Sequence, residues 1–100
     1  MTKAEVITQI ADQTGLDKAD VQIAVEAFVS VVKNSMADGE NIYIRGFGSF
    51  VNKKRAKKIA RDILKNTAIV IDEHYVPSFK PSKVFVERVK NSERVKKANT

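Results

Sequence analysis

The sequence predicts a single domain with an α+β fold, and three observations on its 100 residues support this. Residues 2–15 and 17–39 place apolar side chains at helical intervals between capping residues. Residues 42–51 and 69–79 are rich in β-branched and aromatic residues, which predicts a three-stranded antiparallel sheet. A short third helix is expected after Pro81.

The first predicted helix begins at a capping box. Thr2 stands at the N-cap position and Glu5 follows three residues later, so that each side chain can bond the other residue's backbone amide. Gly15 follows the last apolar position and is expected to end the helix.

The second predicted helix, which Asp17 caps and Gly39 ends, has an unusually wide apolar sector. The sector spans roughly 160°, whereas a helix packed on one surface needs about 100°. Its members are Val21, Ala24, Val25, Phe28, Val29, Val31, Val32 and Met36. We therefore expect a dimer interface on this helix, unless the sheet covers the whole sector within one chain.

The sheet is expected to start with two strands joined by a tight turn. Ile42 and Ile44 alternate with more polar residues, Gly46-Phe47-Gly48 interrupts the pattern, and an apolar run resumes at Phe50.

The C-terminal third contains the last predicted strand and helix. Residues 69–71 predict the third strand, and residues 76–79 continue it as a sheet edge because they contain Pro77. Ser82 is placed to cap the third helix. Residues 92–100 are polar and basic and predict a mobile tail.

Residues 52–68 carry a local pattern that is typical of a basic amphipathic helix. Ala56, Ile59, Ala60, Ile63 and Leu64 recur at helical spacing among basic side chains. Such a helix, over about residues 54–65, could bind an anionic membrane or a protein partner.

Positive charge is concentrated in the second half of the chain. The formal net charge is +6, but residues 1–44 carry three basic and seven acidic side chains, and residues 45–100 carry 15 basic and five acidic ones. Seven of the basic side chains lie between residues 53 and 65. This distribution predicts that the second half binds an anionic partner and that the first half is scaffold.

The composition excludes several other classes of protein. Because the chain has no cysteine and one histidine, it has no disulfide framework, thiolate nucleophile or ordinary zinc site. No apolar run approaches the ~20 residues of a membrane helix, and no catalytic constellation or phosphate-binding loop occurs. We therefore expect a soluble, cytoplasmic, non-enzymatic protein without a metal, cofactor, membrane contact or small-molecule substrate.

Several motifs together resemble one family. They are Gly46-Phe47-Gly48-Ser49-Phe50, Arg55-Ala56, Lys58, Arg61, Ile69, Ile71 and the run from Pro77 to Lys83. In these motifs the chain resembles the bacterial HU/IHF (histone-like, integration host factor) DNA-architectural proteins. The resemblance implies an intertwined dimer, of identical or related subunits, whose β-ribbon arms bend double-stranded DNA from the minor groove with weak sequence selectivity in the nucleoid.

The resemblance also divides the chain into parts. Residues 1–39 would form the helical dimerisation part, residues 40–81 the sheet and arm, residues 82–91 the C-terminal helix, and residues 92–100 the basic tail. Because it places the arm at about residues 53–75, it predicts strands where the local pattern favours a helix.

The predicted arm tip departs from the family pattern of Arg-Asn-Pro with a glycine three residues after the proline. This chain has Arg61-Asp62-Ile63 and Asn66 at those places. Ile63 can act as an apolar wedge in place of the proline, and Asn66 tolerates positive φ. Asp62 either pairs with Arg61 or Lys65, or weakens DNA binding.

The contacts expected with DNA use arginines in the minor groove, amides and a hydroxyl at the glycine turn, and lysines near helix N-termini. The predicted DNA-binding residues are Lys3, Gly46, Gly48, Ser49, Arg55, Lys57, Lys58, Arg61, Ile63, Lys65, Lys80 and Lys83. The residues predicted for the dimer interface are Phe28, Val29, Val32, Phe47, Phe50 and Phe79. A further alternative is an RNA-binding module, but the chain has no aromatic platform for base stacking if Phe47 and Phe50 are packed.

Overall fold

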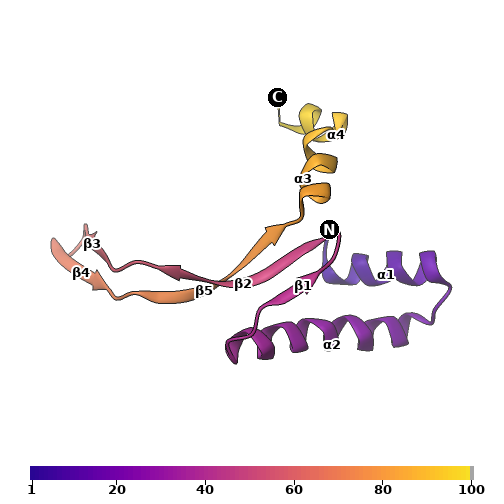
Figure 1. Cartoon of the computed structure of the whole chain (residues 1–100), viewed down its shortest axis with the longest axis horizontal. Helices are drawn as coiled ribbons and strands as arrows, with labels where there is room; N and C mark the ends of the chain where they lie inside the picture. Colours follow the sequence, from indigo (N-terminus) through magenta and orange to yellow (C-terminus); the bar gives the residue numbers. More distant parts are fainter. Residues whose placement is uncertain (100) are drawn as a thin grey trace.

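The computed structural model describes residues 1–99, in which four helices and five strands form a small body and a long ribbon (Figure 1). The helices are α1 (Lys3–Thr14), α2 (Lys18–Ala37), α3 (Lys83–Lys90) and α4 (Glu93–Ala98). The strands are β1 (Ile42–Ile44), β2 (Gly48–Arg55), β3 (Lys58–Asp62), β4 (Thr67–Ile71) and β5 (His74–Pro81). The α1–α2 pair and the α3–α4 pair lie at one end of the molecule, and β3 and β4 lie at the other.

The caps predicted for the first two helices are confirmed, except that the Glu5 carboxylate accepts a hydrogen bond from the Thr2 hydroxyl, at 3.3 Å, and not from the Thr2 amide. The Thr2 hydroxyl accepts a hydrogen bond from the Glu5 amide at 3.3 Å, and Gly15 ends α1 with φ 76°. The Asp17 carboxylate accepts a hydrogen bond from the Ala19 amide at 3.4 Å, which satisfies one of the free amides in the first turn of α2.

The strands form two antiparallel sheets that follow one another along the ribbon. The body sheet has the order β1-β2-β5, and the outer sheet contains β3 and β4. Pro77 lies opposite Asn52 on β5, which is an edge strand, as predicted from its missing amide hydrogen. The three-stranded antiparallel sheet and the ribbon are therefore confirmed. The prediction was wrong for residues 69–71, which belong to β4 of the outer sheet and not to the third strand of the body sheet, β5.

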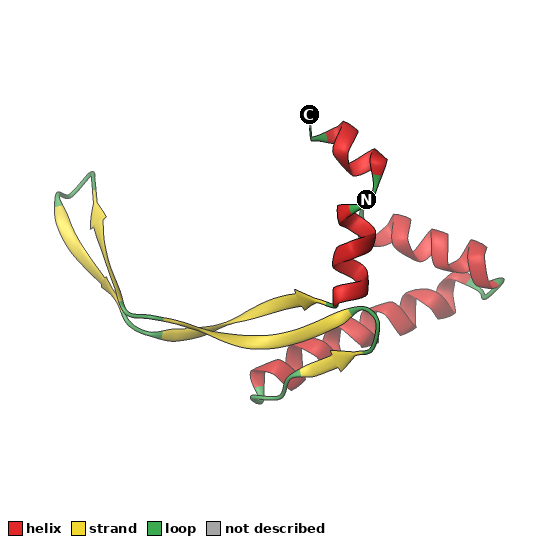
Figure 2. Cartoon of the chain, turned by 45° about the horizontal axis from the view of Figure 1, so that its top comes forward, coloured by secondary structure: helices red, strands yellow, loops and turns green. Residues whose placement is uncertain are grey.

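Residues 52–68 form no helix, so the local helical pattern is wrong for this segment. Strands β2 and β5 pair as far as Arg55 and His74, and β3 and β4 then pair from Lys58 and Ile71 to the tip. The backbone amides and carbonyls of this segment therefore form hydrogen bonds across the strands, in place of the local hydrogen bonds of a helix. The two sheets are separated by short breaks at residues 56–57 and 72–73, where the ribbon bends (Figure 2).

The C-terminal segment forms α4, so the prediction of a mobile tail is wrong for residues 93–98. The Ser92 hydroxyl accepts a hydrogen bond from the Val95 amide at 3.3 Å, and the Asn99 side-chain amide donates to the Val95 carbonyl at 2.8 Å. These two caps supply the order that the polar composition of the segment did not suggest. Thr100 lies outside the described residues.

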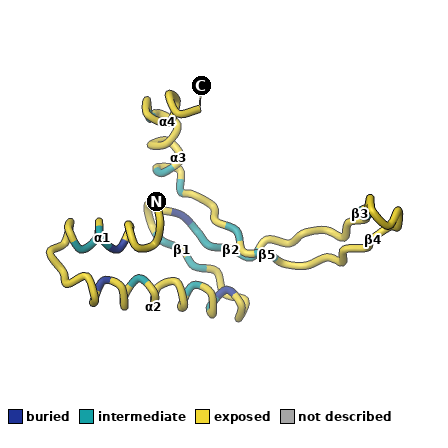
Figure 3. Tube along the Cα trace, turned by 180° about the vertical axis from the view of Figure 1, so that it is seen from behind, coloured by how far each residue is buried: buried dark blue, intermediate teal, exposed yellow. Residues whose placement is uncertain are grey.

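The described chain buries very few side chains. Its buried hydrophobic core consists of Ile7, Val21 and Met36, and both strands of the outer ribbon are exposed almost throughout (Figure 3). The radius of gyration is 18.9 Å, compared with about 13 Å for a compact domain of this length. Within residues 1–99, no helix is long and apolar enough to cross a bilayer.

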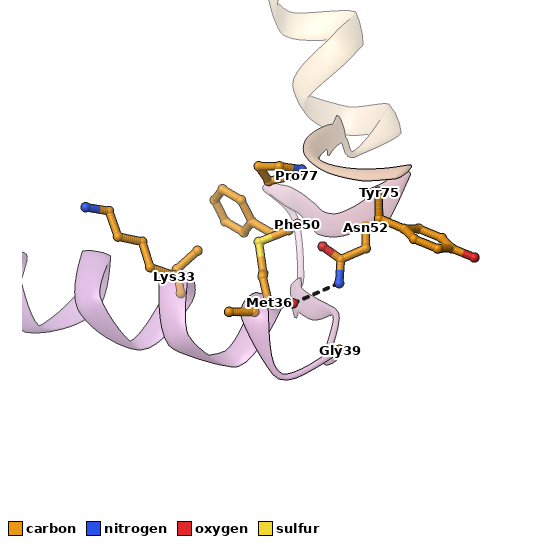
Figure 4. A pocket seen from close by; sticks show the side chains of 9 residues that line it. Lys33, Met36, Gly39, Phe50, Asn52, Tyr75 and Pro77 are labelled. Carbon is orange, nitrogen blue, oxygen red and sulfur yellow. Dashed lines mark hydrogen bonds between the residues drawn. The ribbon is translucent and has the colours of Figure 1, made fainter. Parts of the chain in front are cut away.

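An open apolar groove lies between α2 and the body sheet (Figure 4). It has a volume of about 780 Å³, and Val32, Met36, Phe50 and Pro77 are among the residues that line it. Phe50 and Met36 point toward one another, and the Asn52 side chain donates a hydrogen bond to the Met36 carbonyl at 2.9 Å. One chain therefore leaves unfilled space where a compact domain would have its core.

Candidate nucleic-acid interface

The body sheet has one face against α2 and one open face. Phe50 and Asn52 lie on the face toward α2, where Asn52 bonds the Met36 carbonyl. Because side chains alternate along a strand, Ser49 and Arg55 lie on the opposite face of β2. We call this opposite side the open face; Lys80 shares it because it pairs directly with Ser49.

Lys53 is a residue of the open face that was not among the predicted DNA contacts. It is exposed, and it lies two residues before Arg55 on the same side of β2. Strand alternation through residues 49, 51, 53 and 55 was the signal that would have identified it. Lys54 lies on the face toward α2, and its ammonium nitrogen lies 3.2 Å from a carboxylate oxygen of Glu73.

The turn between β1 and β2 reaches the start of α3. Gly46 is exposed and has φ 80°, a conformation that favours glycine. The Phe47 carbonyl accepts a hydrogen bond from the Ser82 amide at 2.8 Å, which holds the turn beside the N-cap of α3. The predicted residues Gly46, Ser49, Lys80 and Lys83 therefore come together, and we call these four residues the body patch.

Gly48 is required for packing. It is buried, and a Cβ atom at this position would lie 2.6 Å from the Lys80 carbonyl oxygen and 2.7 Å from the Phe79 ring. Close contact between β2 and β5 thus explains the glycine, whereas its predicted contact with phosphate stays a prediction.

The N-terminus of α3 adds a favourable site for anions to the body patch. The Ser82 hydroxyl caps the helix by accepting a hydrogen bond from the Phe85 amide at 3.2 Å. Lys80 and Lys83 are exposed on either side of this cap. Two ammonium groups and the positive end of a helix dipole favour a phosphate group at this place.

The outer ribbon presents its basic residues on both faces. In the register of β3 and β4, Ala60 pairs with Ile69 and Arg61 pairs with Ala68. Strand alternation therefore places Lys58 and Arg61 on opposite faces of the ribbon, so these two predicted DNA contacts do not share one surface. Lys57 lies in the break between β2 and β3.

The tip of the ribbon exposes two aliphatic side chains. Ile63 is 90% exposed and Leu64 is 97% exposed. Asn66 has φ 51°, which confirms its predicted role in the tip turn. One carboxylate oxygen of Asp62, Oδ1, accepts hydrogen bonds from the backbone amides of Leu64, at 3.0 Å, and Lys65, at 3.3 Å. This arrangement differs from the ion pair with Arg61 or Lys65 that was one of the two expectations for it.

Lys3 is held at the α1–α2 pair by an ion pair. Its ammonium nitrogen lies 3.1 Å from a carboxylate oxygen of Glu26. Hydrogen bonds from Lys3 and then from Gln22 hold the pKa of Glu26 below its ordinary value. A contact of Lys3 with phosphate would have to compete with this exposed pair.

Phenylalanine side chains form a cluster on the body. The ring of Phe47 lies 5.0 Å from that of Phe79 and 5.5 Å from that of Phe85, measured between ring centroids. Phe50 joins the cluster at 5.1 Å from Phe79. These rings pack on one another, as predicted in preference to base stacking. Phe47 is still 41% exposed and Phe79 37% exposed, so their place in a dimer interface stays a prediction.

Comparisons with known proteins agree with this geometry. A family model described as bacterial DNA-binding protein matches residues 1–90. The chain is 41% identical over 93 residues to integration host factor subunit beta of Marinobacter nauticus, a match that covers 92% of this chain and 95% of that protein. It is 37% identical over 90 residues to the DNA-binding protein HU of Thermotoga maritima, covering 90% of this chain and 100% of that protein. An Anabaena HU–DNA cocrystal structure matches with a TM-score of 0.86 and 25% identity, covering 92% of this chain and 100% of that one.

Proposed function

Because the chain belongs to the family of bacterial DNA-binding proteins that includes HU and integration host factor, we propose that it is a non-enzymatic DNA-bending protein of the nucleoid that acts as a homodimer. The observation that carries the proposal is the ribbon, which leaves the body with exposed basic and aliphatic side chains. A segment that buries so little within its own chain needs a partner surface, and its charge selects an anionic one.

Dimer formation follows from the unfilled space in the single chain. The groove of about 780 Å³ against the body sheet is open, and Phe28, in the middle of α2, is 48% exposed. A second copy of the chain would cover the groove and Phe28 with its own apolar surface, because the same groove and the same helix α2 occur on each subunit. The dimer then carries two ribbons, which allows it to hold one duplex from two sides.

The contacts divide into two groups by chemistry. The body patch offers an amide, a hydroxyl and two ammonium groups, which suit phosphate oxygens. Along the ribbon, Arg55 and Arg61 suit the minor groove because a guanidinium group is flat and weakly hydrated. Ile63 at the tip then unstacks a base step. Phosphates and the minor groove carry little sequence information, so weak sequence selectivity is expected.

The alternatives fit less well. A membrane or protein partner was expected to bind a basic amphipathic helix, and that segment forms strands β2 and β3 instead. Recognition of single-stranded RNA uses two or three aromatic side chains on one face of a sheet. Phe47, Phe50 and Phe79 pack on one another. The exposed Tyr43 and Tyr75 lie on opposite faces of the body sheet, because they pair with Ser49 and Lys54.

The affinity for duplex DNA is expected to depend steeply on salt. With about 6 to 10 phosphates neutralised per dimer, affinity falls by roughly 10³ to 10⁵ between 50 and 200 mM salt. Fluorescence anisotropy with a labelled duplex measures this slope, and linear, nicked and four-way duplexes compare straight with already deformed DNA. An affinity that does not change with salt would contradict the proposal.

Vesicles of anionic phospholipid provide the control for that experiment. Circular dichroism is expected to show no gain of helix when vesicles replace the duplex, because residues 52–68 are committed to the ribbon. A gain of helix with vesicles and none with DNA would favour the membrane alternative.

A further inference from the structure

We propose that Asp62 is a positioning residue, which fixes the tip turn of the ribbon so that Ile63 and Leu64 project together toward the DNA. The inference rests on the proposed function and concerns how the tip is held. It starts from the two hydrogen bonds of the Asp62 carboxylate, at 3.0 Å from the Leu64 amide nitrogen and 3.3 Å from the Lys65 amide nitrogen.

These two bonds organise the loop from its first strand. Asp62 pairs with Thr67 as the last pair between β3 and β4, and residues 63–66 form the turn between them. A side chain that accepts amides two and three residues further on closes the loop in the way that a backbone turn does. At the other end, Asn66 adopts φ 51° and returns the chain into β4. Asp62 and Asn66 thus fix the two ends of the turn, which lacks the proline and the glycine of the family pattern.

The fixed turn leaves the two aliphatic side chains exposed. Ile63 and Leu64 are 90% and 97% exposed, although aliphatic groups ordinarily turn away from water. Among residues 1–99, no ion pair joins the Asp62 carboxylate to Arg61 or Lys65, so we infer that these two cations are available to phosphates. The tip therefore presents an apolar pair between two cations.

The carboxylate has a second, opposite effect on binding. Its negative charge repels the phosphates that Arg61 and Lys65 attract. Asp62 is therefore expected to lower affinity through its charge and to favour bending through its hydrogen bonds. Asparagine separates the two effects, because it keeps a side-chain oxygen acceptor and removes the charge, whereas alanine removes both.

The test compares Asp62→Asn and Asp62→Ala in the full-length chain. Both variants are expected to bind duplex DNA more tightly than the parent, by up to about tenfold at 0.1 M salt, the contribution of roughly one counterion. Asp62→Asn is expected to bend DNA as the parent does, and Asp62→Ala to lose most of the energy transfer between labelled duplex ends. Equal bending by the asparagine and alanine variants would overturn the proposal.

Two further measurements keep the result specific to the turn. Asp72→Asn and Asp72→Ala remove a charge from the ribbon at the break before β5, and both are expected to bend DNA equally. Hydrogen exchange of the Leu64 and Lys65 amides, measured without DNA, is expected to be slow in the parent and Asp62→Asn and fast in Asp62→Ala. Equal exchange in all three proteins would refute the positioning role. Failure of the parent to bend DNA would instead refute the proposed function.

Discussion

Phe28→Asp is expected to abolish dimer formation and folding together. Phe28 is 48% exposed in the single chain and lines an apolar cavity of about 640 Å³ with Ile10, Val25 and Val29. In the proposed dimer we expect the second chain to cover this region, so the aspartate would be buried without a partner. An unpaired buried charge costs several kcal/mol, which is a large part of the ~5–15 kcal/mol that stabilises a typical domain. Sedimentation and thermal unfolding by circular dichroism measure the two losses.

Ser30→Asp is the matched control for that variant. Ser30 is exposed on α2 and lies about 200° around the helix from Phe28, at 100° per residue. The same charge is therefore expected to leave the dimer and its unfolding temperature nearly unchanged. A folded, soluble monomer of Phe28→Asp would place the dimer interface elsewhere.

Ile63→Ala is expected to reduce DNA bending much more than DNA affinity. Unstacking a base step costs a few kcal/mol, and the apolar side chain in the opened step offsets that cost. Alanine is too short to fill the step, whereas the basic residues of the ribbon still contact phosphates. Energy transfer between labelled duplex ends is therefore expected to fall strongly, while the salt slope and the affinity for nicked DNA change little.

Two neighbouring variants identify the source of the effect. Arg61→Ala is expected to lower both the affinity and the salt slope, because it removes a cation. Leu64→Ala removes the adjacent exposed side chain, which is 97% exposed. If Ile63→Ala bends DNA as the parent does and Leu64→Ala does not, Leu64 is the wedge. If neither variant changes bending, the tip does not intercalate.

The helices were predictable from the sequence because their signals are local. Thr2, Asp17 and Ser82 each cap a helix by accepting a hydrogen bond from an amide two or three residues ahead, so short windows of sequence contain the whole interaction. The α4 helix uses the same device at Ser92, and its polar composition concealed it.

Residues 52–68 of the ribbon were not predictable as strands from local signals, because their order depends on pairing between distant residues. Ile59 and Val70 are cross-strand partners, and neither residue alone distinguishes a strand from an amphipathic helix. The β-branched content of residues 69–71 predicted a strand there, whereas strands over residues 52–68 were expected only through the family resemblance. Once residues 58–62 are known to form a strand, alternation alone places Lys58 and Arg61 on opposite faces.

The tip contains a local signal of the same kind as the helix caps. An ion pair with Arg61 or Lys65 was one of the two expectations for Asp62, because these cations are its neighbours. The carboxylate instead accepts hydrogen bonds from the amides two and three residues ahead, which is a local pattern that Asp side chains form at turns, so a short window of sequence contains the whole interaction.

The central claim is that two copies of this chain bend one duplex. Titration of the protein into a duplex labelled at both ends tests it most directly, with anisotropy measured on the same sample to report binding. Energy transfer is expected to rise with binding and to reach its plateau at two chains per duplex. Saturated binding with no change in energy transfer, or a plateau at one chain per duplex, would contradict the claim.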